Sequence, residues 1–176
     1  MIISLAGFMG CGKSCIGETL CRRLGRSLID LDSHIEETAG RSISAIFKDE
    51  GEAGFRLREA SALTQVLEEN RDRDIVLALG GGTLTIPEAA EEIRERTVCV
   101  YLRAGIDTLV HNLTLWPGDR PMLNEQTGTE ALRRRITELM QQRKAVYEST
   151  AHIIIDIDGM EYDAIAEEII RKTASI

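Results

Sequence analysis

The chain has 176 residues and a mass of 19.5 kDa, a size typical of one domain that buries a hydrophobic core without disulfides or a structural metal. Its 21 basic and 29 acidic residues give a formal net charge of −8, which argues against a protein that coats nucleic acid or an anionic membrane. No apolar run approaches the roughly 18 residues that span a bilayer, and the first residues lack the basic segment of a signal peptide. We therefore expect a cytoplasmic protein that binds neither nucleic acid nor membrane.

Short apolar runs alternate with helical stretches along the chain. The predicted strands are Ile2–Ala6, Ser27–Asp30, Ile75–Leu79, Val98–Leu102 and His152–Ile157. The predicted helices are Lys13–Leu24, Gly51–Glu69, Pro87–Glu95, Asp107–Leu113, Thr129–Ser149 and Tyr162–Lys172. Two Ser/Thr-x-x-Glu patterns, at 33–36 and 85–88, indicate helix starts. Because the strands are nearly continuous apolar runs, they are typical of a parallel α/β sheet covered by helices on both faces.

The four cysteines match no zinc-binding pattern. They are Cys11, Cys15, Cys21 and Cys99, and three of them fall in one short segment. Nothing indicates an oxidising compartment, so free thiols are favoured over a disulfide.

Residues 7–14 match the phosphate-binding pattern G-x-x-x-x-G-K-[ST] between a predicted strand and a predicted helix. In such a loop the backbone N–H groups face phosphate oxygens, the lysine contacts the β- and γ-phosphates, and the hydroxyl binds Mg²⁺. The pattern predicts a site for ATP or GTP; the alternative is a glycine-rich turn that binds nothing. The predicted nucleotide-binding residues of this segment are Gly7, Gly10, Cys11, Gly12, Lys13, Ser14 and Cys15.

Two predicted helices carry an arginine on their apolar face. On Thr129–Ser149, Arg143 falls in the middle of the apolar stripe, whereas neighbouring arginines point the other way. On Gly51–Glu69, Arg56 and Glu59 share the buried face with Phe55. Burying a guanidinium costs several kcal/mol unless an anion or acceptor meets it. An anionic ligand would satisfy both arginines; the alternative for Arg56 is an internal ion pair with Glu59.

Asp30 and Asp32 stand at the carboxyl end of the second predicted strand, and Gly80-Gly81-Gly82 follows the third. The carboxyl ends of parallel strands face the ligand crevice. The carboxylates could hold a magnesium-bound water and a substrate hydroxyl, and the glycines would let the backbone approach a ligand. The alternatives are that Asp32 only introduces the next helix and that the glycines form a plain turn.

One segment, Leu113–Gly128, is rich in Pro, Gly, Asn and Asp and has neither helical nor strand periodicity. A loop of this length inside a compact domain is usually functional. It contains Arg120-Pro121, which places a cation where it could close over bound phosphates. We interpret the segment as a candidate lid.

Taken together, these motifs resemble the shikimate kinase family over nearly the whole chain. The resemblance rests on short motifs in family order and spacing: Gly7 to Ser14; Asp30-Leu31-Asp32 with Ile35-Glu36; Gly40-Arg41-Ser42-Ile43 with Ile46-Phe47; Gly51-Glu52; Phe55-Arg56 with Glu59; Gly80-Gly81-Gly82; Arg120-Pro121-Met122-Leu123; and Arg143 with Tyr147.

The resemblance implies a P-loop NTPase fold: a five-stranded parallel sheet of order 2-3-1-4-5, with helices on both faces and a mobile lid. It implies one domain over residues 1–176, with a substrate-binding region at 33–60 and the lid at 113–128. The implied reaction is ATP-dependent phosphorylation of the shikimate 3-hydroxyl, on the route to chorismate and the aromatic amino acids. The implied partners are ATP, shikimate and Mg²⁺, and the expected state is a monomer.

By the same resemblance, each site residue has an expected role. Lys13, Asp32 and Arg120 would be catalytic, and Arg120 would also contact ATP. Ser14, and Asp30 through water, would serve Mg²⁺. The expected shikimate-binding residues are Asp32, Phe47, Phe55, Arg56, Glu59, Gly80, Gly81, Gly82 and Arg143.

The chain departs from the family where adenine is expected. An arginine usual in the helix before the lid has its nearest equivalent in Asn112, and the run after the last strand is acidic, at 156–159. Two other functions fit parts of the pattern: another small-molecule P-loop kinase, such as a gluconate kinase, or a nucleotide-binding module without transfer chemistry.

Overall fold

The computed structural model describes residues 1–123 and 128–176. Its strands are β1 (Ile2–Ala6), β2 (Ser27–Asp30), β3 (Ile75–Ala78), β4 (Val98–Arg103) and β5 (Ile153–Asp156). They form one sheet of order β2-β3-β1-β4-β5 in which every neighbouring pair is parallel. The predicted fold class and strand order are therefore confirmed.

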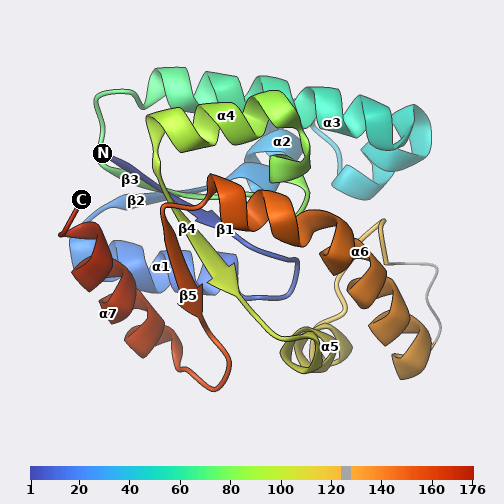
Figure 1. The fold of residues 1–176 in the computed structure, drawn as a ribbon. Coiled ribbons are helices and arrows are strands. Elements are labelled where there is room, and N and C mark those ends of the chain that lie inside the picture. The colour runs from blue at the N-terminus through green and yellow to red at the C-terminus, as the bar shows by residue number, and fades with distance from the viewer. Residues whose placement is uncertain (124–127) are drawn as a thin grey trace.

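Helices cover both faces of this sheet (Figure 1). On one face lie α1 (Lys13–Leu24) and α7 (Tyr162–Thr173), and on the other lie α3 (Ile43–Glu69), α4 (Pro87–Arg96) and α6 (Thr129–Thr150). The remaining helices are α2 (Leu31–Ala39), α5 (Ile106–Leu115) and the short 3₁₀ turn η1 (Thr83–Thr85). Among the described residues, no helix is long and apolar enough to cross a bilayer.

The apolar strands supply two separate cores. Alternate residues of a strand point to opposite faces, so Ile3 and Leu5 of β1 pack under α1 and α7, whereas Ile2 and Ala6 pack under α3, α4 and α6. Both faces of the sheet are thus buried, which explains why these strands show no polar alternation in the sequence.

The sequence prediction was wrong about how helices start near the second strand. β2 passes directly into α2, whose N-cap is Asp30: its side chain accepts a hydrogen bond from Ser33 N. The carboxylate of Glu36 accepts a hydrogen bond from Ile43 N at 2.9 Å, at the start of α3. Glu36 therefore does not form a capping box with Ser33. The pattern at 85–88 also fails, because the N-cap of α4 is Ile86 and has no side-chain cap.

The helix predicted from Gly51 begins at Ile43 and bends at Gly51. Gly51 has φ 70° and ψ −179°, a backbone conformation that is essentially restricted to glycine. The bend folds the short segment 43–50 back against the longer one, so that Phe47 stacks on Phe55 with their ring centroids 4.8 Å apart.

All four cysteines are free, as predicted, and three of them are buried. Cys15 is the exposed one.

Replacing Gly51 by alanine should lower the free energy of unfolding by about 3 kcal/mol, because a Cβ there forces a strained backbone. Nothing lies within 4 Å of the added Cβ, so the loss comes from the backbone alone. Gly25→Ala is the matched control: its site is equally open, but its φ of 65° and ψ of 31° are left-handed helical, so about 1 kcal/mol is expected. Urea denaturation measures both, and equal losses would contradict the interpretation.

Candidate active site

The phosphate-binding loop lies at the carboxyl end of β1, the central strand, and leads into α1. Lys13 Nζ donates hydrogen bonds to the carbonyl oxygens of Gly7, at 2.9 Å, and Phe8, at 3.1 Å. The loop is also held from outside, since Asn112 Nδ2 on α5 donates to Gly10 O at 2.9 Å. The side chain of Lys13 is thus held by carbonyl groups of its own loop, and a hydrogen bond from Asn112 connects this loop to α5.

Ser14 and Asp30 bring two oxygen ligands together beside this loop. Ser14 Oγ donates to Asp30 Oδ2 at 2.6 Å, and the other carboxylate oxygen caps α2. A hydroxyl and a carboxylate are oxygen donors of the kind Mg²⁺ prefers, and Mg²⁺ commonly uses one or two protein groups and completes its shell with water and phosphate oxygens. The pair therefore fits the predicted magnesium site.

Asp32 stands on the first turn of α2, between the phosphate-binding loop and α3. Burial raises the pKa of Asp32 to about 6, and the nearby carboxylates of Glu59 and Asp30 act in the same direction. The charges of Lys13 and Arg56 lower this pKa and partly offset the effect. A carboxyl with such a pKa is still mostly ionised at neutral pH and can accept a proton.

Glu59 is fully buried, and both of its carboxylate oxygens are hydrogen-bonded. Arg56 Nη1 donates to Oε2 at 2.5 Å, and the hydroxyl of Thr83 donates to Oε1 at 2.5 Å. The ion pair that we considered for Arg56 is therefore present, but it does not use the whole guanidinium: among the described residues, Nη2 donates one hydrogen bond, to the exposed Glu52 at 3.3 Å. Arg56 also lies over the ring of Phe55, 5.3 Å from its centroid.

The glycine triplet passes through the narrow space among these charged groups. A Cβ on Gly80 would lie 2.6 Å from a Glu59 oxygen and 2.8 Å from an Asp32 oxygen, and one on Gly82 would lie 2.3 Å from Arg56 Nη2. Distances this short exclude a side chain unless the charged groups move, which favours close approach over a plain turn.

Arg143 is almost fully buried, with 3% of its surface exposed, as its place on the apolar stripe predicts. Its Nη1 donates to Gly81 O at 3.0 Å, and the guanidinium lies 5.5 Å from the ring centroid of Phe8. The hydroxyl of Tyr147 donates to the same carbonyl. Burial raises the pKa of Tyr147, so this phenol remains a donor at neutral pH. Together these contacts fix Arg143 beside the glycine triplet.

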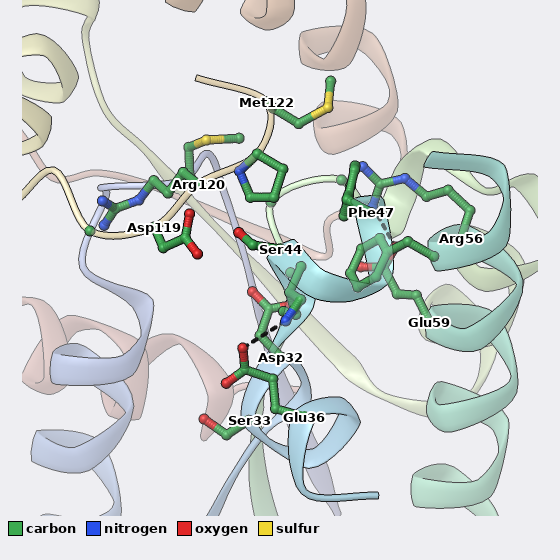
Figure 2. A pocket seen from close by; sticks show the side chains of 18 of the residues that line it. Asp32, Ser33, Glu36, Ser44, Phe47, Arg56, Glu59, Asp119, Arg120 and Met122 are labelled. Carbon is green, nitrogen blue, oxygen red and sulfur yellow. Dashed lines mark hydrogen bonds and ion pairs between the residues drawn. The ribbon is translucent and has the colours of Figure 1, made fainter. Parts of the chain in front are cut away.

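Asp32, Arg56, Glu59, the glycine triplet and Arg143 line one cavity of about 310 Å³, shown in Figure 2, whereas Lys13, Ser14 and Asp30 are not part of its lining. All nine residues that we predicted to bind the acceptor line it. Met9 of the phosphate-binding loop also lines it, and a Cβ on Gly81 would lie 3.1 Å from Met9 N, so cavity and loop are in contact. The cavity thus joins a phosphate-binding loop to a lining of three guanidiniums (Arg56, Arg120, Arg143) and four carboxyl groups (Asp32, Glu36, Glu59, Asp119).

Residues 118–122 of the candidate lid form one wall of the cavity, whereas 113–115, predicted as part of the loop, belong to α5. Gly118, Asp119, Arg120, Pro121 and Met122 line it, while 124–127 lie outside the described residues. Arg120 Nη1 donates to Trp116 O at 2.8 Å. Partial burial lowers the pKa of Arg120, but a guanidinium stays charged at neutral pH.

Comparison with known proteins agrees with this geometry. The sequence model of the shikimate kinase family matches residues 9–174. A shikimate kinase from Bordetella pertussis is 38% identical over 170 residues, which cover 97% of this chain and 77% of the relative. The chain belongs to the shikimate kinase family.

Solved structures place the fold in the same family. A shikimate kinase from Acinetobacter baumannii, solved in complex with shikimate, has a TM-score of 0.90 and 32% identity over 99% of this chain and 93% of that one. A gluconokinase from Sinorhizobium meliloti has a TM-score of 0.59 at 14% identity over 98% of this chain and 91% of that one, a likeness that shows the fold alone.

Sequence analysis missed Thr83 as a member of the site. Thr83 is fully buried in η1, and its hydroxyl donates a hydrogen bond to Glu59, which lies 24 positions earlier in the sequence. A possible signal was its place directly after the glycine triplet, where a small polar residue ends a tight turn. Family motifs had marked Tyr147 but gave no contact for it, whereas the structure shows it on Gly81 O.

Thr83→Val should destabilise the fold by about 1–3 kcal/mol, because the isosteric change removes the donor and leaves a buried carboxylate oxygen unpaired. Thr64→Val is the matched control, since Thr64 Oγ1 donates to Glu92 Oε1 at 2.7 Å on the exposed surface. This substitution should lower the free energy of unfolding by no more than about 0.5 kcal/mol. Denaturant unfolding compares the two variants. Equal effects would show that the buried position of the Thr83 bond has no energetic importance.

Proposed function

We propose that this protein transfers the γ-phosphoryl group of ATP to the 3-hydroxyl of shikimate, giving shikimate 3-phosphate and ADP on the route to chorismate and the aromatic amino acids. The observation that carries the proposal is the cavity in which Arg56, Arg143 and Asp32 face a space continuous with the phosphate-binding loop. It has groups for an anionic acceptor, for a hydroxyl and for a phosphate donor. We propose further that it acts as a monomer in the cytoplasm.

On the nucleotide side, the backbone N–H groups of the loop would hold the phosphates, and Lys13 would leave its carbonyl partners to contact the β- and γ-phosphates. The proposed ATP contacts in this segment remain Gly7, Gly10, Cys11, Gly12, Lys13, Ser14 and Cys15. Ser14, and Asp30 through water, would hold Mg²⁺, which when bound neutralises charge on the β- and γ-phosphate oxygens.

On the acceptor side, Arg56 and Arg143 would bind the carboxylate of shikimate. Arg56 keeps Nη2 available apart from one exposed contact with Glu52, and Arg143 reaches the cavity from α6 on the other side of the glycine triplet. The stacked rings of Phe47 and Phe55 offer an apolar surface to the carbon ring. Glu59 would orient Arg56, and not bind the acceptor by charge, because two carboxylates would repel.

Asp32 would orient the 3-hydroxyl and accept its proton. The hydroxyl oxygen forms a bond to the γ-phosphorus while the bond from that phosphorus to the β–γ bridging oxygen breaks, and ADP leaves with the electron pair. Because the transition state of phosphoryl transfer is loose, positioning and charge stabilisation matter more than a strong base. Lys13 and Arg120 would stabilise the charge on the transferred group.

The segment 33–60 would form the acceptor-binding region, and 113–128 would form the lid. Closure of the lid would bring Arg120 toward the phosphates and exclude water that would otherwise hydrolyse ATP. This role needs Arg120 to give up its hydrogen bond to Trp116 O.

ADP release in the presence of shikimate, gluconate or a nucleoside monophosphate tests the proposal against its alternatives. We expect ADP release to depend on shikimate, because the buried Arg143 and the partly buried Arg56 select a carboxylate and the stacked phenylalanines select a ring. Release driven by gluconate would favour the gluconate kinase alternative, and nucleotide binding without acceptor-dependent release would favour a non-catalytic module.

Asp32→Asn should lower kcat by about a hundredfold or more, because the amide keeps the shape of the carboxylate but cannot accept a proton. The KM for ATP should change little, since no proposed phosphate contact is lost. Asp72→Asn, in an exposed loop after α3, is the control and should leave both constants unchanged. Steady-state kinetics with each substrate varied measure the effect, and a near-normal kcat would refute a catalytic role for Asp32.

A further inference from the structure

One hydroxyl in the cavity wall has no hydrogen-bond partner among the described residues. Ser44 Oγ is buried, and Ser44 lines the cavity together with Asp32 and Phe47. Figure 2 shows Ser44 at the start of the short helical segment that begins α3, and Asp32 and the lid residue Asp119 line the same cavity. Leaving a buried hydroxyl unpaired costs about 1–3 kcal/mol, so this group calls for a partner.

The helix itself does not need this hydroxyl. The N-cap of α3 is Ser42, whose Oγ accepts from Ala45 N at 3.2 Å, and Ile43 N is served by Glu36 Oε1. The N–H groups of Ile43 and Ala45 at this helix start are therefore satisfied by side chains other than Ser44. Serine also has no packing advantage over alanine, which is the better helix former.

We propose that Ser44 binds a hydroxyl group of the acceptor and contributes to the selection of a polyhydroxylated substrate. This inference rests on the proposed function and extends it to a residue outside the family motifs. The two guanidiniums suit the carboxylate of the acceptor, and Asp32 suits the hydroxyl that reacts. A neutral hydroxyl on the same wall as Asp32 can donate to, or accept from, a second hydroxyl of the ring. A site that hydrogen-bonds a substrate hydroxyl disfavours analogues without it, because its own polar group is then left unpaired.

Ser44→Ala should raise the KM for shikimate about tenfold, the effect of losing one neutral hydrogen bond. The KM for ATP and kcat should change little, because Ser44 Oγ makes no hydrogen bond to the described phosphate-binding loop and, as proposed, binds a hydroxyl other than the reacting one. The melting temperature should stay the same or rise, since no hydrogen bond within the protein is lost. Ser61→Ala, at an exposed position of the same helix and outside the cavity, is the control and should leave all four quantities unchanged.

Acceptors that lack one of the two non-reacting ring hydroxyls make the test specific. For one of these deoxy analogues, the unchanged protein and Ser44→Ala should have the same KM, because the partner of Ser44 is already missing. An unchanged KM for shikimate in Ser44→Ala, or a tenfold difference that persists with both analogues, would overturn the assignment. A lower melting temperature with an unaltered KM would show a structural role and overturn it too. Absence of shikimate-dependent turnover in the unchanged protein would overturn the proposed function first, and Ser44 with it.

Discussion

The buried carboxylate of Glu59 is the interaction on which the rest of the site depends. An ionised group with no exposed surface is stable only if hydrogen bonds replace its water, and here Arg56 and Thr83 supply one bond to each oxygen. These bonds join α3 to η1 and so fix the glycine triplet between them. They also hold Arg56 at the cavity and place a negative charge next to Asp32, which helps to raise its pKa.

The distribution of charge explains how an acidic protein can serve anionic ligands. The net charge of −8 is a sum over the whole chain and does not say where the charges lie. In the described structure, Arg56, Arg120 and Arg143 line one cavity, and Lys13 lies close enough to lower the pKa of Asp32. Local potential depends on the nearest charges and on the dielectric around them, so net charge is a weak guide to small ligands.

Features set by local sequence were predictable. The phosphate-binding loop is a contiguous motif, and Arg143 follows from the 3.6-residue period of one helix. Features set by contacts between distant segments were not: Thr83 reaches Glu59, and Asn112 reaches the loop at Gly10, through folding alone. The start of α2 was predicted too late in the sequence. Asp30 is both the last residue of β2 and the N-cap of α2, whereas the sequence pattern placed the cap at Ser33.

The bend at Gly51 lets the two parts of α3 form two walls of the cavity, held against each other by the stacked rings of Phe47 and Phe55. The long part of α3 carries the charged network that every acceptor carboxylate would meet, and altering it would disturb the core. The short part, 43–50, is tied down by Glu36 and Ser42 at its own start and contributes only small or apolar side chains to the cavity. Substitutions there can reshape the pocket without breaking a buried ion pair. Gly51 thus allows one helical element to supply both a charged wall and an apolar wall of the same cavity.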